Sequence, residues 1–160
     1  MDNIKKGDRG YTDSLAAKNI KKDDPRVIAL ARLDRLSTEL GMAKLENPAL
    51  KNQLTAIQAV LIEIMGTISG SGKKLGPRHL DFLDGEISRL KQQLPPLKEF
   101  VLPGVNRAEI SLHLARTSCR LAETTAVAAN TDADILAYIN RLSLYLFTLA
   151  RRAAKDNDID

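Results

Sequence analysis

Four ionisable residues form the clearest chemical pattern in the sequence: His113, Arg116, Arg120 and Glu123. They follow one another at intervals of three, four and three residues, which places them on one stripe of a helix, beside its apolar face. Two guanidinium groups there need carboxylate or phosphate partners, because an unpaired charge near an interface is costly. The stripe therefore predicts either a salt bridge between subunits, which the periodicity favours, or a site for an anionic ligand.

Asp34 is the candidate partner of Arg116. Its neighbours Leu33 and Leu36 belong to the apolar face of another predicted helix, so Asp34 lies at the edge of that face. We therefore expect an ion pair between Asp34 and Arg116.

Other kinds of catalytic or metal site have little support in the sequence. The segment GSGKK at 70–74 suggests a phosphate-binding loop, but the glycine spacing is wrong and Lys74 stands where Ser or Thr would bind magnesium. We expect an interhelical loop there. The two histidines lack ligands at zinc spacing, and Ser118 and Ser143 have no paired base. We predict neither a protein metal site nor a protein nucleophile.

The elements that must position the charged stripe are helices. Apolar residues recur at alternating intervals of three and four residues, which is typical of helices packed nearly parallel or antiparallel. The first helix should begin at Asp24-Pro25 and end before Asn47-Pro48. The stripe's helix should begin near Asn106, with Glu109 completing a capping box. The other three apolar series run from Leu50 to Ile64, from Leu80 to Leu90 and from Ile135 to Leu149.

These patterns predict an all-α fold: a five-helix up-and-down bundle without strands. We assign residues 24–154 to the bundle, residues 1–23 to a loop arm and residues 155–160 to a polar tail. A loop arm of this length is often functional.

Composition narrows the function classes. The 160 residues suffice for one domain, and the single Cys119 excludes an internal disulfide framework. No apolar run approaches the roughly 20 residues of a membrane span, and the charged N-terminus does not resemble a signal peptide, so we expect a cytoplasmic protein. The net charge of +4 is spread along a chain without Trp, which disfavours nucleic acid but suits a small phosphate-bearing ligand.

Five segments, in this order, resemble those of the PduO-type ATP:cob(I)alamin adenosyltransferases. The resemblance covers nearly the whole chain, and the order of the motifs is more specific than any one of them. The segments are GDRGYT at 7–12, KDDPR at 22–26, LPPLKEFVLPG at 94–104, LHLARTSCRLAE at 112–123 and INRLSLYLFTLAR at 139–151.

The resemblance implies a homotrimer of five-helix bundles that holds ATP with Mg²⁺ and cobalamin between neighbouring subunits. It also implies the reaction: Co(I) attacks the 5′ carbon of ATP, giving adenosylcobalamin and triphosphate. The protein would orient ATP and help to reduce Co(II) by removing the lower axial ligand. A reductase or an acceptor enzyme is an implied partner, whereas nucleic acid and membrane are not.

The resemblance also implies roles for individual residues. Phe100 would close the lower corrinoid face and act in catalysis with Arg120, which reaches the triphosphate. From the residues alone, Phe100 could equally belong to the core. Arg116 and Asp34 would form the intersubunit salt bridge. The implied ATP-binding residues are Lys6, Gly7, Gly10, Thr12, Lys22, Arg120, Glu123 and Asn140.

The chain departs from the family pattern mainly around the phosphate site. Asp13 follows the arm threonine where the family has a small hydroxyl residue, and Ala16-Ala17 replaces a glycine pair. Leu121 and Thr124 replace two arginines. Further replacements are Arg35, Val105 and Leu144. A second hypothesis is therefore a relative that keeps the trimer and binds a corrinoid or a protein without transferring adenosyl.

Overall fold

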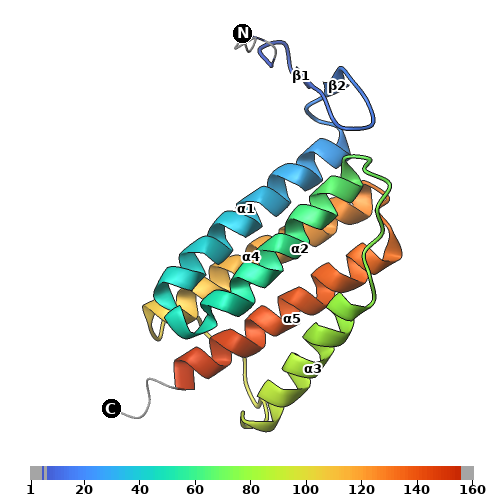
Figure 1. Cartoon of the computed structure of the whole chain (residues 1–160). Coiled ribbons are helices and arrows are strands. Elements are labelled where there is room, and N and C mark those ends of the chain that lie inside the picture. The colour runs from blue at the N-terminus through green and yellow to red at the C-terminus, as the bar shows by residue number, and fades with distance from the viewer. Residues whose placement is uncertain (1–4, 6, 156–160) are drawn as a thin grey trace.

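The protein is described here by a computed structural model, which defines residue 5 and residues 7–155. Within these residues it contains five α-helices, one 3₁₀ turn and one pair of short strands (Figure 1). The elements in chain order are β1 (Tyr11–Thr12), β2 (Ile20–Lys21), α1 (Pro25–Glu46), the 3₁₀ turn (Pro48–Leu50), α2 (Lys51–Ile68), α3 (Arg78–Gln92), α4 (Arg107–Ala128) and α5 (Ala133–Lys155). The predicted number of helices is confirmed.

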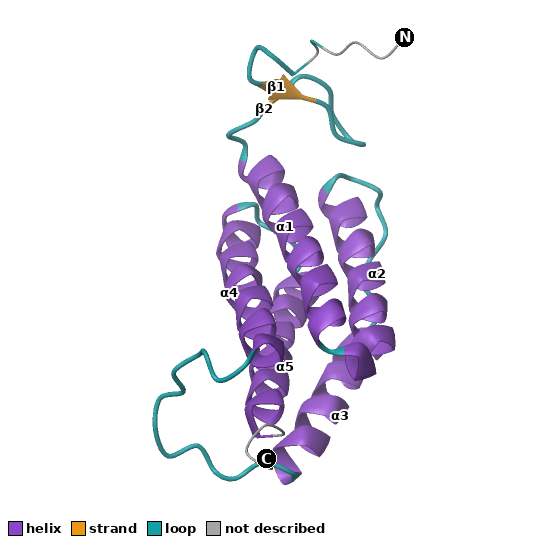
Figure 2. Cartoon of the chain, turned by 90° about the vertical axis from the view of Figure 1, so that its left-hand side faces the viewer, coloured by secondary structure: helices purple, strands orange, loops and turns teal. Residues whose placement is uncertain are grey.

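The helices lie side by side around α4 and α5 (Figures 1 and 2). Helix α4 packs against α1 on one side and α5 on the other, while α2 flanks α1 and α3 flanks α5. The arm that carries β1 and β2 lies beyond one end of the bundle, next to the start of α1 (Figure 2). No helix in the described part of the chain is long and apolar enough to cross a membrane.

The ends of α1 follow from local chemistry. The Asp24 carboxylate accepts a hydrogen bond from the backbone N–H of Arg26 (2.9 Å), and Pro25 occupies the first turn. At the other end, the Ala43 carbonyl accepts from both the backbone N–H (2.9 Å) and the side-chain Nδ2 (3.0 Å) of Asn47, the C-cap residue. Both predicted ends of this helix are confirmed.

The predicted capping box at α4 is only half correct. Asn106 Oδ1 accepts from the backbone N–H of Glu109 (2.8 Å), as expected. The Glu109 carboxylate does not return the bond to Asn106 but accepts from the N–H groups of Gly104 (2.9 Å) and Val105 (3.2 Å). The loop before α4 folds back over the helix start, so these two N–H groups, and not that of residue 106, meet the carboxylate.

The core is built from the apolar series of all five helices. The fully buried side chains include Leu33, Leu61, Leu83 and Leu142. Burial of each such side chain stabilises the folded state by about 1.5–3 kcal/mol. Cys119 Sγ donates to the Ile139 carbonyl (3.2 Å), which joins α4 to α5.

The expectation of no strand was wrong within the arm. Thr12 pairs with Ile20 and Tyr11 with Lys21 in a two-residue antiparallel ladder. The connecting turn is closed by the Asp13 carboxylate, which accepts from the N–H of Asn19 (2.9 Å). Such a short ladder has no alternating apolar pattern, so no periodicity of the sequence predicts it.

Candidate functional site

The arm brings together four of the residues predicted to bind ATP. Lys22 Nζ donates to the Gly7 carbonyl (2.8 Å), and the Lys22 N–H donates to the Gly10 carbonyl (2.8 Å). Gly10 has a positive φ of 78°, which favours glycine at this turn. Thr12 lies in the adjoining strand β1. Lys6 falls outside the described residues, so its predicted role stays a prediction.

A cleft of about 580 Å³ separates the arm from the first half of α1. Thr12 and Lys22 line it from the arm, and Arg32 and Arg35 line it from the helix. Arg35 is partly engaged, because its Nε donates to Glu39 (2.9 Å). One hydroxyl and three cationic groups around an open cleft suit a phosphate-bearing ligand.

Sequence reasoning missed Arg32, and it treated Arg35 only as a departure from the family. Ile28, Arg32 and Arg35 follow at helical spacing on the part of α1 that faces the cleft. That spacing was visible in the sequence. What the sequence did not reveal is that Thr12 and Lys22 of the arm line one cleft with this face.

The departures in the arm have local structural roles. The Asp13 carboxylate closes the turn to Asn19, and Asn19 takes the left-handed conformation with φ of 58°. Neither Ala16 nor Ala17 has a positive φ, so the backbone at these two positions does not require the replaced glycines. Asparagine tolerates this conformation better than most residues do, and here it takes over the role of a turn glycine.

On α4, the four residues of the predicted stripe differ in exposure. His113 is 3% exposed, Arg116 and Glu123 are half-buried, and Arg120 is exposed. Arg116 Nε donates to His113 Nδ1 (3.1 Å), and the Arg116 guanidinium carbon lies 5.9 Å from the centre of the Phe147 ring. Burial, together with the nearby Arg120, lowers the pKa of Arg116, so the environment disfavours its charge. This is the environment in which a carboxylate or phosphate partner stabilises arginine most.

Asp34 does not supply that partner within one chain. It is exposed on α1, and its backbone carbonyl accepts from Thr38 Oγ1 (3.1 Å). The ion pair between Asp34 and Arg116 of a neighbouring subunit stays a prediction.

The predicted ATP ligands form two groups on the single chain. The clefts lined by the arm contain none of Arg120, Glu123 or Asn140. Asn140 is exposed on α5. One group therefore belongs to the arm and α1, and the other to α4 and α5.

Phe100 lies in the loop of residues 93–106 and is fully exposed, so its alternative assignment to the core was wrong. Leu97 and Leu102 in the same loop are also largely exposed. An apolar loop of this kind marks a surface that contacts a ligand or a partner.

Comparison with known proteins assigns the chain to a family. The family model for cobalamin adenosyltransferase matches residues 3–153. The chain belongs to this family. It is 35% identical to the corrinoid adenosyltransferase of Bos taurus, over 94% of this chain and 70% of that protein, and 35% identical to the one from Citrobacter freundii, over 91% and 90%.

Solved structures of the cobalamin adenosyltransferase family agree in fold. A phenylalanine-to-histidine variant of the PduO-type ATP:corrinoid adenosyltransferase from Lactobacillus reuteri, complexed with cobalamin and ATP, matches with a TM-score of 0.91 and 30% identity, over 99% of this chain and 93% of that one. An arginine-to-lysine variant complexed with ATP matches with a TM-score of 0.88 and 31% identity, over 97% and 95%.

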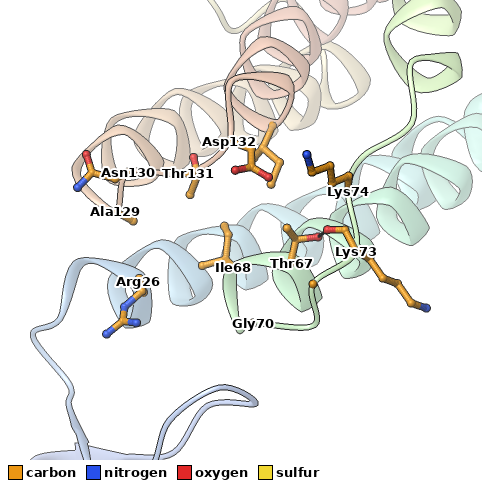
Figure 3. A pocket seen from close by; sticks show the side chains of 12 residues that line it. Arg26, Thr67, Ile68, Gly70, Lys73, Lys74, Ala129, Asn130, Thr131 and Asp132 are labelled. Carbon is orange, nitrogen blue, oxygen red and sulfur yellow. Dashed lines mark hydrogen bonds between the residues drawn. The ribbon is translucent and has the colours of Figure 1, made fainter.

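The glycine-rich segment 70–74 is an interhelical loop, as predicted, and lines a second cleft of about 440 Å³ (Figure 3). The Arg26 guanidinium at this cleft is held by the Asp24 carboxylate (2.9 and 3.0 Å). Lys74 points toward Asp132 from the opposite wall (Figure 3). Both charge types therefore line this cleft, in contrast to the basic cleft beside the arm.

Cys119 is poorly suited to act as a nucleophile in this member of the family. Its thiol is fully buried, and burial strongly raises its pKa, with the nearby Glu123 adding to the rise. Among the described residues, no three His, Cys, Asp or Glu side chains are grouped so that they could hold a metal ion.

Proposed function

We propose that this chain transfers the 5′-deoxyadenosyl group of ATP to the cobalt of cob(I)alamin. The electron pair of Co(I) forms the Co–C5′ bond, and the C5′–O bond to triphosphate breaks with its pair on oxygen. The products are adenosylcobalamin, with formal Co(III), and triphosphate. The protein contributes orientation and charge stabilisation, and Mg²⁺ bound to ATP helps to neutralise the leaving group.

One observation carries this proposal: the chain matches, over nearly its whole length, a relative complexed with both cobalamin and ATP. The arm supports it independently, because Thr12, Lys22 and Arg32 converge on a basic cleft. The buried thiol of Cys119 is consistent with a reaction that needs no protein nucleophile.

We infer that the active site forms between subunits of a homotrimer of up-and-down bundles. The arm and α1 of one subunit would hold the triphosphate through Gly7, Gly10, Thr12 and Lys22. Arg120, Glu123 and Asn140 of the neighbour would complete the ATP site. This inference is supported by the separation of the two groups on one chain and by the half-buried Arg116, which would pair with Asp34.

We propose that Phe100 closes the lower face of the corrinoid. Exposure of an aromatic ring in an apolar loop to water is energetically unfavourable unless a ligand covers the ring. Excluding water and the lower axial ligand from cobalt would make Co(II) easier to reduce. A reductase would supply that electron, and an acceptor enzyme would take the product. The single free thiol fits a reducing, cytoplasmic setting.

Absorbance spectroscopy of the full chain with ATP, Mg²⁺ and chemically reduced cobalamin tests the activity. We expect the spectrum of adenosylcobalamin to develop, and calorimetry to show ATP binding. Arg120→Ala should slow product formation strongly, whereas Arg141→Ala, which removes a surface pair with Asp84 (2.8 Å), should not. Absence of ATP binding at millimolar concentration would contradict the enzyme and favour the non-catalytic relative.

The second hypothesis, a relative that does not transfer adenosyl, rests on the replacement of two family arginines by Leu121 and Thr124. Both side chains are exposed on α4, and neither can form the charge-assisted bond of an arginine. Each lost bond to phosphate costs about 1.5–3 kcal/mol. We propose that Arg32 and Arg35, from the opposite side of the site, offset this loss.

A further inference from the structure

A buried carboxylate lies where the loop of residues 93–106, which carries Phe100, joins α4. Glu109 is 0% exposed, and its Oε2 accepts from the N–H groups of both Gly104 (2.9 Å) and Val105 (3.2 Å). Gly104 has φ of 127°, a conformation that favours glycine and lets consecutive N–H groups converge. Glu109 thus fixes the end of the loop that carries Phe100.

The other oxygen of the same carboxylate faces His113. Glu109 Oε1 lies 3.1 Å from His113 Nε2, and the opposite ring nitrogen, Nδ1, accepts from Arg116 Nε at 3.1 Å. Arginine can only donate, so Nδ1 carries no proton. In the neutral ring the proton is then on Nε2. This nitrogen is in close polar contact with the carboxylate, but the two groups are not aligned for a hydrogen bond. Burial lowers the pKa of His113 and supports this neutral form.

The chain of contacts continues to Arg116, at the predicted subunit contact. Its guanidinium is braced on one side by His113 and on another by the Phe147 ring. The loop end, Glu109, His113 and Arg116 are therefore connected by close polar contacts along one face of α4. Networks of this kind have few alternative arrangements in a low-dielectric interior, so a change at one end is felt at the other.

We propose that Glu109 and His113 are positioning residues that couple the loop at 93–106 to Arg116. In terms of the proposed function, on which this interpretation rests, they would link closure over the corrinoid to the contact between subunits. The coupling itself belongs to the chain alone and can be measured without ATP, corrinoid or activity.

Glu109→Gln gives the sharpest perturbation, because it keeps the shape and changes the pattern of donors. The loop N–H groups still require the amide oxygen, so the amide NH₂ must face His113 Nε2. His113 would then accept at Nε2 and carry its proton on Nδ1, where it meets the N–H of Arg116. The variant should therefore reverse the histidine tautomer and break the bond to Arg116.

Nuclear magnetic resonance of the ¹⁵N-labelled full chain tests the network at both ends. We expect the ring nitrogens of the wild type to report the Nε2–H tautomer, and those of Glu109→Gln to report Nδ1–H. Amide hydrogen exchange at Gly104 and Val105 should be about tenfold faster in Glu109→Gln, since the bonds lose their charge.

The decisive variant is Arg116→Met, because the contacts of Arg116 within the described residues are with His113 and Phe147 and include no hydrogen bond or ion pair to the loop. Coupling predicts faster exchange at Gly104 and Val105 in this variant, by about threefold or more. His113→Gln places its amide NH₂ near the position of Nε2 but has no acceptor at the position of Nδ1, so it should behave similarly. The matched control is Arg107→Met, which removes a guanidinium from the first turn of α4 whose ion pair among the described residues is with Glu46 (2.9 Å).

Unchanged exchange at both amides in Arg116→Met and His113→Gln would overturn the proposal and reduce Glu109 to a local loop anchor. An Nδ1–H tautomer in the wild type would also overturn it. If Glu109→Gln does not fold, Arg116→Met and His113→Gln still decide. A failure of adenosyl transfer would leave these results unaffected, so the two proposals fail separately.

Discussion

At the scale of single residues, the environment decides what each side chain can do. His113 is held neutral by burial in a network whose other members are Glu109 and Arg116, whereas Arg120, seven residues from His113 on the same stripe, is exposed. Arg32 lines a basic cleft together with Thr12 and Lys22 of the arm. Two predictions concern these residues.

His113 should make the stability of the protein depend on pH. Its pKa is lowered in the folded chain, first by burial and then by Arg116, with Glu109 opposing both effects. The unfolded chain binds a proton below about pH 6.5, and the folded chain does so only at lower pH. Stability is therefore complete above pH 6.5 and falls as the pH is lowered, by up to ~1.4 kcal/mol per pH unit. Urea unfolding at several pH values between 7.5 and 5.5 measures this dependence. The free energy of unfolding of His113→Asn should change less steeply with pH than that of the wild type.

The other histidine provides the control for this measurement. His79 is half-buried and lies 3.6 Å from the exposed Glu63 carboxylate. His79→Asn is the matched substitution at the other histidine and is measured under the same conditions. If the free energy of unfolding changes equally with pH in the wild type and in His113→Asn, the prediction is contradicted.

Arg32 should contribute to ATP binding more than Arg35 does. Arg32 has no hydrogen-bonded partner among the described residues, while Arg35 Nε already donates to Glu39. Arg32→Ala should weaken ATP binding by about 1.5–3 kcal/mol, the value for a charge-assisted bond to phosphate. Arg35→Ala should have a smaller effect. Calorimetric titration with ATP and Mg²⁺ compares the two variants, and equal affinity of Arg32→Ala and wild type would exclude Arg32 from the site.

At the scale of elements, the sequence predicted what depends on neighbouring residues. The predicted ends of α1 were correct because Asp24, Pro25 and Asn47 act on groups within one helical turn of themselves. The carboxylate partner of the loop at 93–106 and the hairpin of the arm were not predicted. Both depend on segments that fold back on themselves, and no residue spacing records that path.

The docking of the arm on the loop between α2 and α3 leads to a prediction at this scale. Ala16 N–H donates to the Ser69 carbonyl (2.9 Å), and a Cβ on Gly70 would overlap the Ala16 side chain. Gly70→Ala should displace the arm and weaken ATP binding by about tenfold or more, because ordering the arm then costs binding energy.

Gly72→Ala is a matched control for Gly70→Ala. Both glycines have positive φ, of 72° and 100°, so both variants carry the same kind of backbone strain, about 1–3 kcal/mol. A Cβ on Gly72 would meet no atom within 4 Å. Calorimetry with ATP should therefore show a loss for Gly70→Ala beyond that for Gly72→Ala. Equal losses would mean that the arm contact does not affect the nucleotide site.

At the scale of the whole molecule, one chain presents two separate groups of candidate ATP ligands, which we propose to be the two halves of an intersubunit site. The arm cleft offers cations from Lys22, Arg32 and Arg35, and the stripe of α4 offers Arg116 and Arg120 from a different surface. The sequence could predict the members of the stripe from their helical spacing. It could not show which surface of a second chain faces them, because that depends on assembly and leaves no periodic pattern within one chain.

Assembly should therefore depend on Asp34 and Arg116 together. Asp34→Arg places two cations against each other across the predicted contact, and Arg116→Asp places two anions there, so each single variant should shift the protein from trimer toward monomer. The combination of both restores opposite charges in reversed order and should recover the trimer at least in part. Sedimentation velocity over a range of protein concentrations measures the shift, with calorimetry reporting whether ATP binding is lost and regained in parallel. A double variant no more associated than either single one would show that the two residues do not meet. ATP binding that survives in the monomer would place the whole nucleotide site on the arm and α1 of one chain.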